Sequence, residues 1–452
     1  MTKAQTAGRA EADLMTEGSI GKKILLFSIP LILGNLLQQL YNTMDSIIVG
    51  NFVGSGALAA VGSSTTVINL LIAFSQGAAV GAGVVAAQYM GAGKRSGVQS
   101  AVHTALAMAA VLGIFLSLGG IFFTRTLLIW MKTPAEVLAD SVLYMQIYSG
   151  GLLFNVLYNM AAGILNAAGN SRRSLLYLGC ASVTNIVLDL ILIAGFGLGV
   201  EGAAIATDLS QLLSCLLALR FLTRVSADYQ VRLRKIRIEG DMALRIIRIG
   251  LPTGIQNMVI SLSNVLVQSS VNSFGAKAMA GFGAYMKIDG FNILPVMSLS
   301  MAVTTFAGQN YGAGKLDRVK KGLAFTLVLS CVYTVATGIL LLLCAYPVMR
   351  LFTSDPEVIA DGKLVMRYFC PFYVLLGLMH SLAGAVRGTG RTMPPMIIML
   401  ASLCVFRVIW LSFIFPQLGT LGAVYLQYPV SWALGAALMA LYAWRGHWLR
   451  QN

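Results

Sequence analysis

The sequence predicts an all-α membrane protein of twelve transmembrane helices, arranged as two parallel six-helix repeats. Its composition, its apolar stretches and an internal repeat indicate this class. The 452 residues are 57% hydrophobic and only 11% charged, with a mean hydropathy of +0.78, which lies outside the range of ordinary soluble domains. Apolar stretches of roughly 20 residues or more, the length that crosses a bilayer, recur along the whole chain.

The apolar stretches place the spans between short polar breaks. We expect them at residues 24–50, 57–88, 98–123, 138–166, 174–196, 200–222, 243–272, 280–307, 322–346, 358–386, 393–415 and 420–444. The first 23 residues are hydrophilic and resemble no cleavable signal peptide. The first span should therefore direct its own insertion.

Basic residues fall in alternate connections between the predicted spans. One side collects most of them: Lys3, Arg9, Lys22, Lys23, Lys94, Arg95, Arg172, Arg173, the run from Arg220 to Arg248, Lys315, Arg318, Lys320, Lys321, Arg387, Arg391, Arg445 and Arg450. The other side holds little beyond Arg125, Lys132, Lys277 and Arg350. By the positive-inside rule, both termini should lie in the cytoplasm of a multi-pass cell-membrane protein.

The net charge of +15 is therefore interpreted as a topology signal rather than as a nucleic-acid surface. The central 220–248 stretch can also meet anionic lipid head groups. The six cysteines lie in or near the predicted spans without metal-ligand spacing, so we expect them to act as packing residues.

An internal repeat relates the two halves of the chain. QYMGAGK at 88–94 recurs as QNYGAGK at 309–315, and PAEVLAD at 134–140 recurs as DPEVIAD at 355–361, both 221 residues later. Six spans per copy give both copies the same orientation, so two parallel lobes should face each other across a cleft. We expect a tail at 1–23, an N-lobe at 24–222, a basic connector at 223–242, a C-lobe at 243–444 and a tail at 445–452.

Glycine-rich segments raise the possibility of nucleotide binding. Residues 197–202 fit GxGxxG, but no strand precedes them, and GAGK lacks the remaining residues of a phosphate-binding loop. We expect no cofactor and no enzymatic activity.

Two polar stripes follow helix periodicity. The first span carries Asn35, Gln38 and Asn42, and the seventh carries Asn257, Ser261, Asn264 and Gln268. Spacings of three and four place each set on one helix face. Lipid cannot satisfy amides, so these stripes are predicted to line a substrate cavity. Hydrogen bonding between helices is the alternative interpretation.

Acidic residues occur inside the predicted spans of the first half. NIVLDLILI at 185–193 sets Asn185 and Asp189 four residues apart, while Asp45 and Thr207 come from the first and sixth spans. At about 1.5 Å per residue, all four should lie roughly 8–16 Å below the outer surface. Two repelling carboxylates in apolar surroundings would hold a proton near neutral pH or, with amide and hydroxyl oxygens, bind Na⁺. Hydrogen bonding of a protonated Asp189 within the bundle is the structural alternative.

The second half lacks acids at the equivalent positions, which fall near Val267 and near Ile409 or Trp410. It carries Lys287, Asp289 and Arg407 within its spans instead. These charges either pair with one another or contact substrate, and the sequence does not decide between the two. Asp208 follows Thr207 but points about 100° away on the helix, and we assign it no role.

The chain resembles the multidrug and toxic compound extrusion (MATE) family over essentially its whole length. IPLILGN (29–35), MDSIIVG (44–50), the paired QYMGAGK and QNYGAGK loops, and NIVLDLILIAGFGLGVEGAAIAT (185–207) carry this resemblance. It implies twelve-helix antiporters in which H⁺ or Na⁺ entry drives export of mostly cationic, amphipathic compounds. It also implies an ion site at Asp45, Asn185, Asp189 and Thr207. Some branches use acids of the seventh and tenth helices, but here the seventh span has none and Asp361 lies near the membrane edge.

These features favour a monomeric secondary transporter that exports small organic cations by alternating access. A flippase for a lipid-linked precursor is the alternative, although a phosphate-bearing lipid should require a cationic cavity. A channel or receptor is disfavoured by the duplicated unit.

Overall fold

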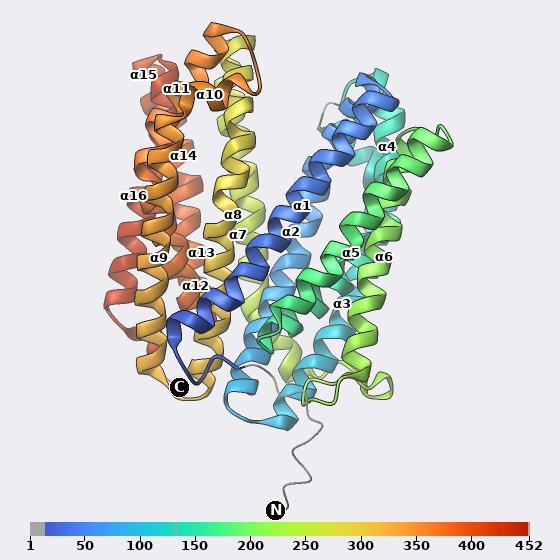
Figure 1. Cartoon of the computed structure of the whole chain (residues 1–452), viewed down its shortest axis with the longest axis vertical. Helices are drawn as coiled ribbons and strands as arrows, with labels where there is room; N and C mark the ends of the chain where they lie inside the picture. The colour runs from blue at the N-terminus through green and yellow to red at the C-terminus, as the bar shows by residue number, and fades with distance from the viewer. Residues whose placement is uncertain (1–13, 132, 451–452) are drawn as a thin grey trace, which may run out of the picture. The chain divides into compact units, whose positions relative to one another are not determined.

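The structure is a computed structural model and describes residues 14–131 and 133–450 (Figure 1). Lys3, Arg9 and Lys132, which contributed to the predicted orientation, lie outside these residues. The described chain is helical and contains no strand. Eleven of its helical segments are long and apolar enough to cross a membrane. Helix α7 (Gly240–Asn272) is a twelfth long helix, so the predicted fold class is confirmed.

Packing divides the chain into two compact units. Of the described residues, unit 1 contains Leu14 and those between 29 and 254, and unit 2 contains 15–28 and 255–450. Both divisions fall inside continuous helices, α1 (Ile20–Phe52) and α7, and each of these helices contains a proline close to the division, Pro30 or Pro252. The units therefore differ from the lobe boundaries predicted from the repeat, which remain a prediction.

Unit 1 is built around α4. Its further elements are α2 (Ser55–Gly91), α3 (Arg95–Trp130), α4 (Ala135–Ala167), α5 (Ser171–Asp189), the π-helical η2 (Leu190–Gly195), α6 (Val200–Arg224) and the short η3 (Leu233–Lys235). Helix α4 packs against α2, α3 and α6, and α5 packs against α6. Small residues permit close approach: a Cβ on Gly77 of α2 would lie 2.6 Å from the Cα of Gly254 in α7.

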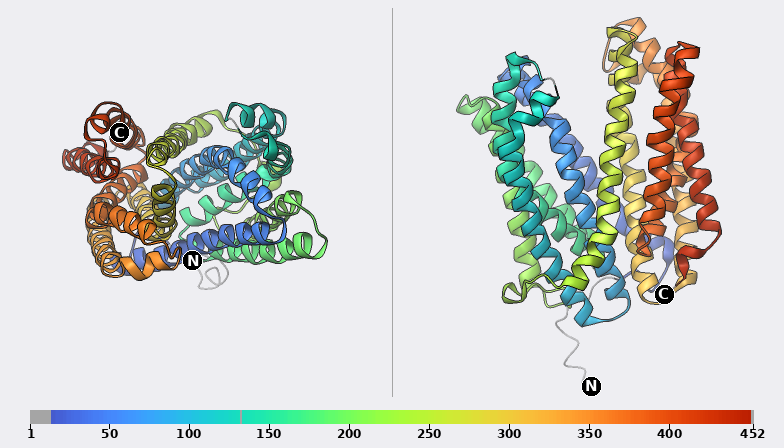
Figure 2. Two further views of the ribbon diagram at one scale, coloured as in Figure 1. Left: turned by 90° about the horizontal axis from the view of Figure 1, so that it is seen from above. Right: turned by 180° about the vertical axis from the view of Figure 1, so that it is seen from behind.

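Unit 2 repeats this plan with more interruptions. Its elements are α8 (Ala276–Gly312), α9 (Leu316–Leu343), α10 (Ala345–Arg350), α11 (Pro356–Phe369), η4 (Cys370–Phe372), α12 (Tyr373–Gly388), α13 (Met393–Leu400), η5 (Ala401–Val405), α14 (Phe406–Ile409), η6 (Trp410–Ile414), α15 (Phe415–Leu418), α16 (Leu421–Trp444) and η7 (His447–Leu449). Helix α12 packs against α8, α9 and α16. Figure 2 shows the same elements from two further directions.

The repeated GAGK loops have the same backbone geometry in both units. Gly93 and Gly314 adopt φ angles of 65° and 72°, a left-handed conformation that favours glycine. The backbone N–H groups of Lys94 and Lys315 then donate to the carbonyl oxygens of Tyr89 and Asn310, at 3.1 and 2.8 Å. This arrangement is a glycine-terminated helix end, so the GAGK motif forms a tight turn between helices in both units.

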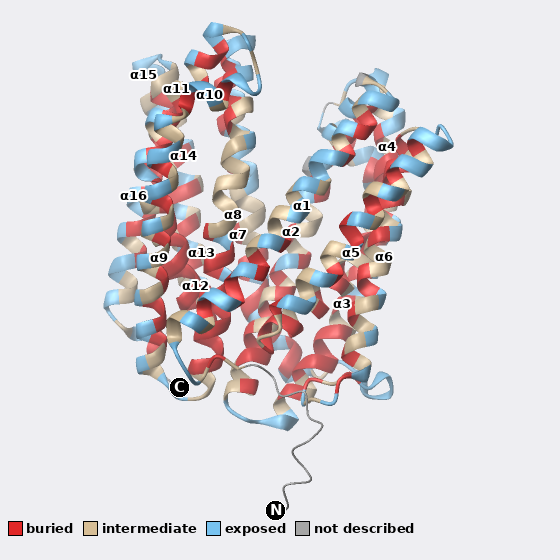
Figure 3. Cartoon of the chain, in the orientation of Figure 1, coloured by how far each residue is buried: buried red, intermediate tan, exposed pale blue. Residues whose placement is uncertain are grey.

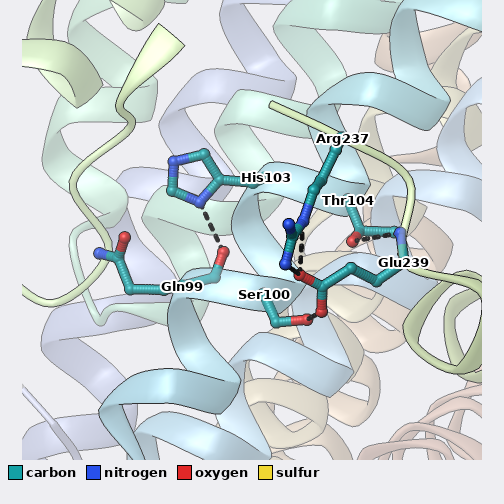
Figure 4. A network of polar contacts seen from close by, with 6 residues as sticks. All are labelled: Gln99, Ser100, His103, Thr104, Arg237 and Glu239. Carbon is teal, nitrogen blue, oxygen red and sulfur yellow. Dashed lines mark hydrogen bonds and ion pairs between the residues drawn. The ribbon is translucent and has the colours of Figure 1, made fainter. Parts of the chain in front are cut away.

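Residues 225–239 of the predicted connector (223–242), which lie between α6 and α7, are fixed to the first turns of α3. His103 accepts the N–H of Arg232 at Nε2 (3.0 Å), while its Nδ1 lies 2.6 Å from the carbonyl oxygen of Gln99. The Glu239 carboxylate accepts hydrogen bonds from Ser100 and from the guanidinium of Arg237 (Figure 4). The connector is therefore part of unit 1 and not a free linker.

The segment that precedes α1 is fixed in the same manner in unit 2. The N–H of Met15 donates to Oε1 of Gln309 at 2.7 Å. The carbonyl oxygen of Met15 accepts from Asn310 at 3.2 Å and from Arg318 at 3.1 Å. Each repeated loop region thus holds the chain segment that leads into the first helix of the other repeat.

Candidate ion-binding site

Four sequence-predicted residues lie in the interior of unit 1. Asp45 comes from α1, Asn185 and Asp189 from α5, and Thr207 from α6. Their exposed fractions are 8%, 1%, 0% and 4%, so water hydrates none of these side chains appreciably. Figure 3 shows the buried residues of these helices in red. An ionised carboxylate in such surroundings is costly unless another charge or a proton compensates it.

The structure brings these side chains into one site. Nδ2 of Asn185 donates to Oγ1 of Thr207 at 3.4 Å, which links α5 to α6. The carboxyl groups of Asp45 and Asp189 are close enough to influence each other's charge, which links α1 to α5. One amide, one hydroxyl and two carboxyl groups therefore share a buried region formed by three helices.

Several oxygen atoms of this site lack donors. Oδ1 of Asp45, Oδ1 of Asn185 and both carboxyl oxygens of Asp189 are buried and accept no hydrogen bond from any described group. Buried acceptors in native proteins are almost always satisfied. A bound proton would turn one carboxyl oxygen into a donor, and a cation such as Na⁺ would take these oxygens as ligands. The donor set fits either ion.

The backbone changes form at Asp189. Helix α5 ends at this residue and continues as the π-helical η2, although the apolar run of the sequence predicts one uninterrupted span. Extra residues in a helical turn loosen the regular hydrogen bonding, and such bulges are frequent at functional sites. The equivalent span of unit 2 has two π-helical segments, η5 and η6, on either side of Arg407.

Three tyrosines that the sequence did not single out lie near the carboxylates. Tyr41, Tyr144 and Tyr148 all lie within electrostatic reach of Asp45. The rings of Tyr144 and Tyr148 stack at a centroid distance of 6.2 Å. Their spacing of four residues on one helix was visible in the sequence, but aromatic residues at helical spacing usually indicate simple packing.

Asp208 also lies inside unit 1, facing α4. Its carboxylate fills the space beside Gly151, where an added Cβ would lie 2.0 Å from Oδ1. Oδ1 accepts no hydrogen bond from a described group. The sequence indicated only that Asp208 points away from Thr207.

The predicted cavity residues are exposed or half-buried on their helices. Gln38 and Asn42 of α1 and Ser261 and Asn264 of α7 are exposed, while Asn35, Asn257 and Gln268 are half-buried. Among these side chains, Asn264 accepts a hydrogen bond from Arg407, and Gln268 donates to Asn272 of its own helix. Their assignment to substrate remains a prediction.

The charges inside unit 2 have separate partners. Asp289 of α8 accepts a hydrogen bond from Tyr373, whose hydroxyl also contacts that of Tyr285. Arg407 is 3% exposed; it donates to Ser431 at 3.2 Å and to Asn264 at 3.1 Å, and its guanidinium lies 4.3 Å from the centre of the Tyr428 ring.

Neither Asp289 nor Arg407 forms an ion pair with a described residue. Lys287 is exposed on α8. The sequence left open whether Lys287, Asp289 and Arg407 pair with one another or contact substrate. The structure shows no ion pair among these three residues.

A duplicated six-helix membrane unit with a buried carboxylate site in one copy defines a membrane transporter of the parallel-repeat class. The MatE family model matches the chain twice, at residues 30–191 and 252–411. The chain therefore belongs to the MatE family, and its matched relatives include multidrug resistance and multidrug export proteins. The two matched segments start at Pro30 and Pro252, in agreement with the internal repeat.

Individual relatives agree with this assignment. The probable multidrug resistance protein YpnP of Bacillus subtilis (strain 168) is 31% identical over 433 residues, covering 96% of this chain and 97% of that protein. The probable multidrug resistance protein NorM of Thermotoga maritima is 30% identical, covering 89% and 88%. A multidrug resistance MATE family transporter of the MOP superfamily, solved in an outward-facing conformation, superposes with a TM-score of 0.90 at 25% identity, covering 97% and 98%.

Proposed function

We propose that this protein is a secondary antiporter that exports organic, mostly cationic and amphipathic compounds in exchange for H⁺ or Na⁺. The coupling ion binds at Asp45, Asn185, Asp189 and Thr207. The observation that carries this proposal is the convergence of buried acceptor oxygens from α1 and α5 that have no donor among the described residues, next to the hydrogen bond that joins Asn185 to Thr207 of α6. Both termini lie in the cytoplasm, because the basic connections share one side.

The exchange follows from reciprocal linkage. When the ion is absent, two carboxylates repel each other inside unit 1 and favour a conformation in which α1 stands away from α5 and α6. Binding of H⁺ or Na⁺ removes this repulsion, so the helices draw together and the affinity for substrate falls. Ion and substrate need only prefer different conformations, and typical couplings of roughly 1–3 kcal/mol change affinity about 5–150-fold.

The polar stripes supply the proposed substrate contacts. Amide and hydroxyl side chains on α1 and α7 can bind many compounds, since they offer donors and acceptors without a fixed charge. Organic cations are favoured because the carboxylates of unit 1 lie on or beside the helix that carries Asn35, Gln38 and Asn42.

Proteoliposome efflux tests the proposal directly. The purified protein is reconstituted, loaded with a fluorescent organic cation such as ethidium, and exposed separately to an imposed pH gradient and an imposed Na⁺ gradient. We expect one of the two gradients to drive export. Export that responds to neither gradient, from vesicles shown to contain folded protein, would contradict antiport.

A distance measurement tests the movement of α1. Spin labels at Val49 and Phe196 lie at the outer ends of α1 and of the α5–η2 span. Their separation should change with pH or Na⁺ in the wild type and stay constant in Asp189→Asn. A separation insensitive to both ions in the wild type would remove this mechanism but leave the antiport proposal to the efflux assay.

A further inference from the structure

Unit 2 contains a groove of about 650 Å³ formed by α9, α12, α16 and η7. Helix α12 packs against both α9 and α16, and its Leu378 and Leu382 line the groove between them. Three alanines of α16, Ala436, Ala440 and Ala443, face the same space at spacings of four and three. Small side chains on one face of α16 therefore leave room that larger residues would fill.

The exposed surface of α9 that continues beyond the groove is apolar. All exposed residues of α9 after Leu327 are apolar, among them Val328, Val332 and Ile339. The exposed face of α7, by contrast, carries Ser261 and Asn264. A transmembrane helix surface without polar groups is the surface that lipid chains can cover.

The length and position of the groove match one leaflet. Its lining residues on α9 run from Leu316 to Leu327, which is about 16 Å along the helix. One leaflet of hydrocarbon has a similar depth of about 15 Å. The start of α9 and the end of α16 lie at the end of unit 2 that carries Lys320, Lys321 and Arg445 (Figure 1). Under the proposed orientation this is the cytoplasmic leaflet.

One cation lies among the apolar lining residues of this groove, four residues, or about 6 Å along the helix, after Leu316. Lys320 is the charged residue among the groove's described lining residues, and it forms no ion pair with a described carboxylate. Trp444 beside it is 85% exposed, as expected for an aromatic residue at the membrane interface. The N–H of the Trp448 ring donates to the carbonyl oxygen of Ala443 at 2.9 Å, which fixes the end wall.

We propose that this groove binds an anionic phospholipid of the cytoplasmic leaflet, with one acyl chain between α9 and α16 and the lipid phosphate at Lys320. An apolar groove with one lysine near its end, which has no ion-pair partner among the described residues, is complementary to one anionic lipid molecule. A lysine reaches the head-group level by extending its stem along apolar surface. The site is independent of which compounds the protein transports.

Native mass spectrometry of the purified protein tests the site, with palmitoyl-oleoyl phosphatidylglycerol and the phosphatidylcholine of the same chains as probes. We expect the wild type to retain phosphatidylglycerol preferentially. Lys320→Ala should reduce that preference about fivefold, the effect of one cation near the membrane surface. Lys321→Ala is the matched control. Lys321 is the next residue of the chain and is exposed, but it does not line the groove.

A second pair of variants tests the acyl-chain position. Ala440→Trp should fill the groove and displace both lipids, whereas Leu441→Trp, on an exposed residue outside the lining, should displace neither. Equal effects of the two lysine variants, or full lipid retention by Ala440→Trp, would overturn the proposal. If a second copy of the chain filled the groove, the spectra would show a dimer without bound lipid. That result would also overturn the proposal.

Discussion

In unit 1, four carboxylate oxygens of Asp45, Asp189 and Asp208 lie buried without a hydrogen-bond donor among the described residues. In unit 2, Asp289 accepts a hydrogen bond from Tyr373, and the buried guanidinium of Arg407 has two hydrogen-bonded partners and an aromatic ring. The two units descend from one repeat and share helix order and turn geometry. They differ in whether their interior charges are satisfied by the protein itself.

This difference indicates that the two units have different roles, one in ion response and the other in stability. A satisfied network holds one arrangement, because each change breaks a hydrogen bond. An unsatisfied set of acceptors is stabilised only when an external ion binds, so its conformation depends on the ion. We therefore expect ion dependence to follow substitutions in unit 1, and packing stability to follow substitutions in the interior of unit 2.

The largest expected effect comes from Asp189→Asn. This substitution removes the charge that an ion must neutralise, so gradient-driven export should fall by about tenfold or more, within the usual range of coupling between sites. Efflux from proteoliposomes with matched protein content measures it. Asp289→Asn is the unit 2 control: its amide oxygen can still accept from Tyr373, so export should keep its ion dependence. Loss of ion dependence in Asp289→Asn alone would reverse the assignment of the two units.

Asn42 and Asn264 occupy equivalent positions of the repeat. The variants Asn42→Leu and Asn264→Leu therefore distinguish a side chain that contacts substrate from one that holds a buried arginine. Asn264 accepts a hydrogen bond from Arg407, so its replacement leaves a buried cation short of a partner and should cost about 1–3 kcal/mol of stability. Asn42 supports no such group, and its replacement should change the substrate profile instead. Thermal unfolding in detergent and efflux of several compounds measure the two effects. Equal destabilisation by both variants would show that Asn42 also serves as a structural hydrogen-bonding residue.

The turn glycines should behave alike in both units. Gly93→Ala and Gly314→Ala place a side chain in the left-handed region, and no atom lies within 4 Å of the added Cβ at either position. The cost is therefore backbone strain alone, about 1–2 kcal/mol in each case. Gly314→Asn should cost less, because asparagine tolerates this conformation. A large difference between the two alanine variants in thermal unfolding would mean that the two loops are not equivalent.

The smallest expected effect concerns the connector. Hydrogen bonds from Ser100 and Arg237 lower the pKa of Glu239 below its ordinary value of 4.5. A lowered pKa means that the docked connector is stabilised above pH 4.5 and loses this support as pH falls below it. The Arg237–Glu239 pair is exposed, so Glu239→Gln should cost well under about 1 kcal/mol.

A spin label at Lys235 reports this change as increased connector mobility. Asp241→Asn, at an exposed acid two residues away, is the control and should leave the mobility unchanged. Equal mobility in wild type and Glu239→Gln at neutral pH would show that His103 and Gln99 alone hold the connector.

The sequence predicts most of this architecture because apolar length and repeat offset are global signals that survive local irregularity. It also brings Asp45, Asn185, Asp189 and Thr207 to comparable depths, since helical rise is constant. It does not predict the π-helical turn after Asp189, because the deciding contacts come from other helices. It leaves open the partners of Asp289 and Arg407 for the same reason: Tyr373 and Ser431 look like ordinary packing residues until the helices are placed.

The docking of residues 15–18 beside the second GAGK loop has a consequence for synthesis. Met15 bonds Gln309, a partner 294 residues further along the chain. At about 5–20 residues per second, roughly 15–60 s separate the two during translation. The start of α1 must therefore enter the membrane before the ribosome has made the Gln309 region that later holds the segment preceding α1. A chain truncated before Gln309 should leave this segment open to proteolysis in isolated membranes, whereas the full chain should protect it.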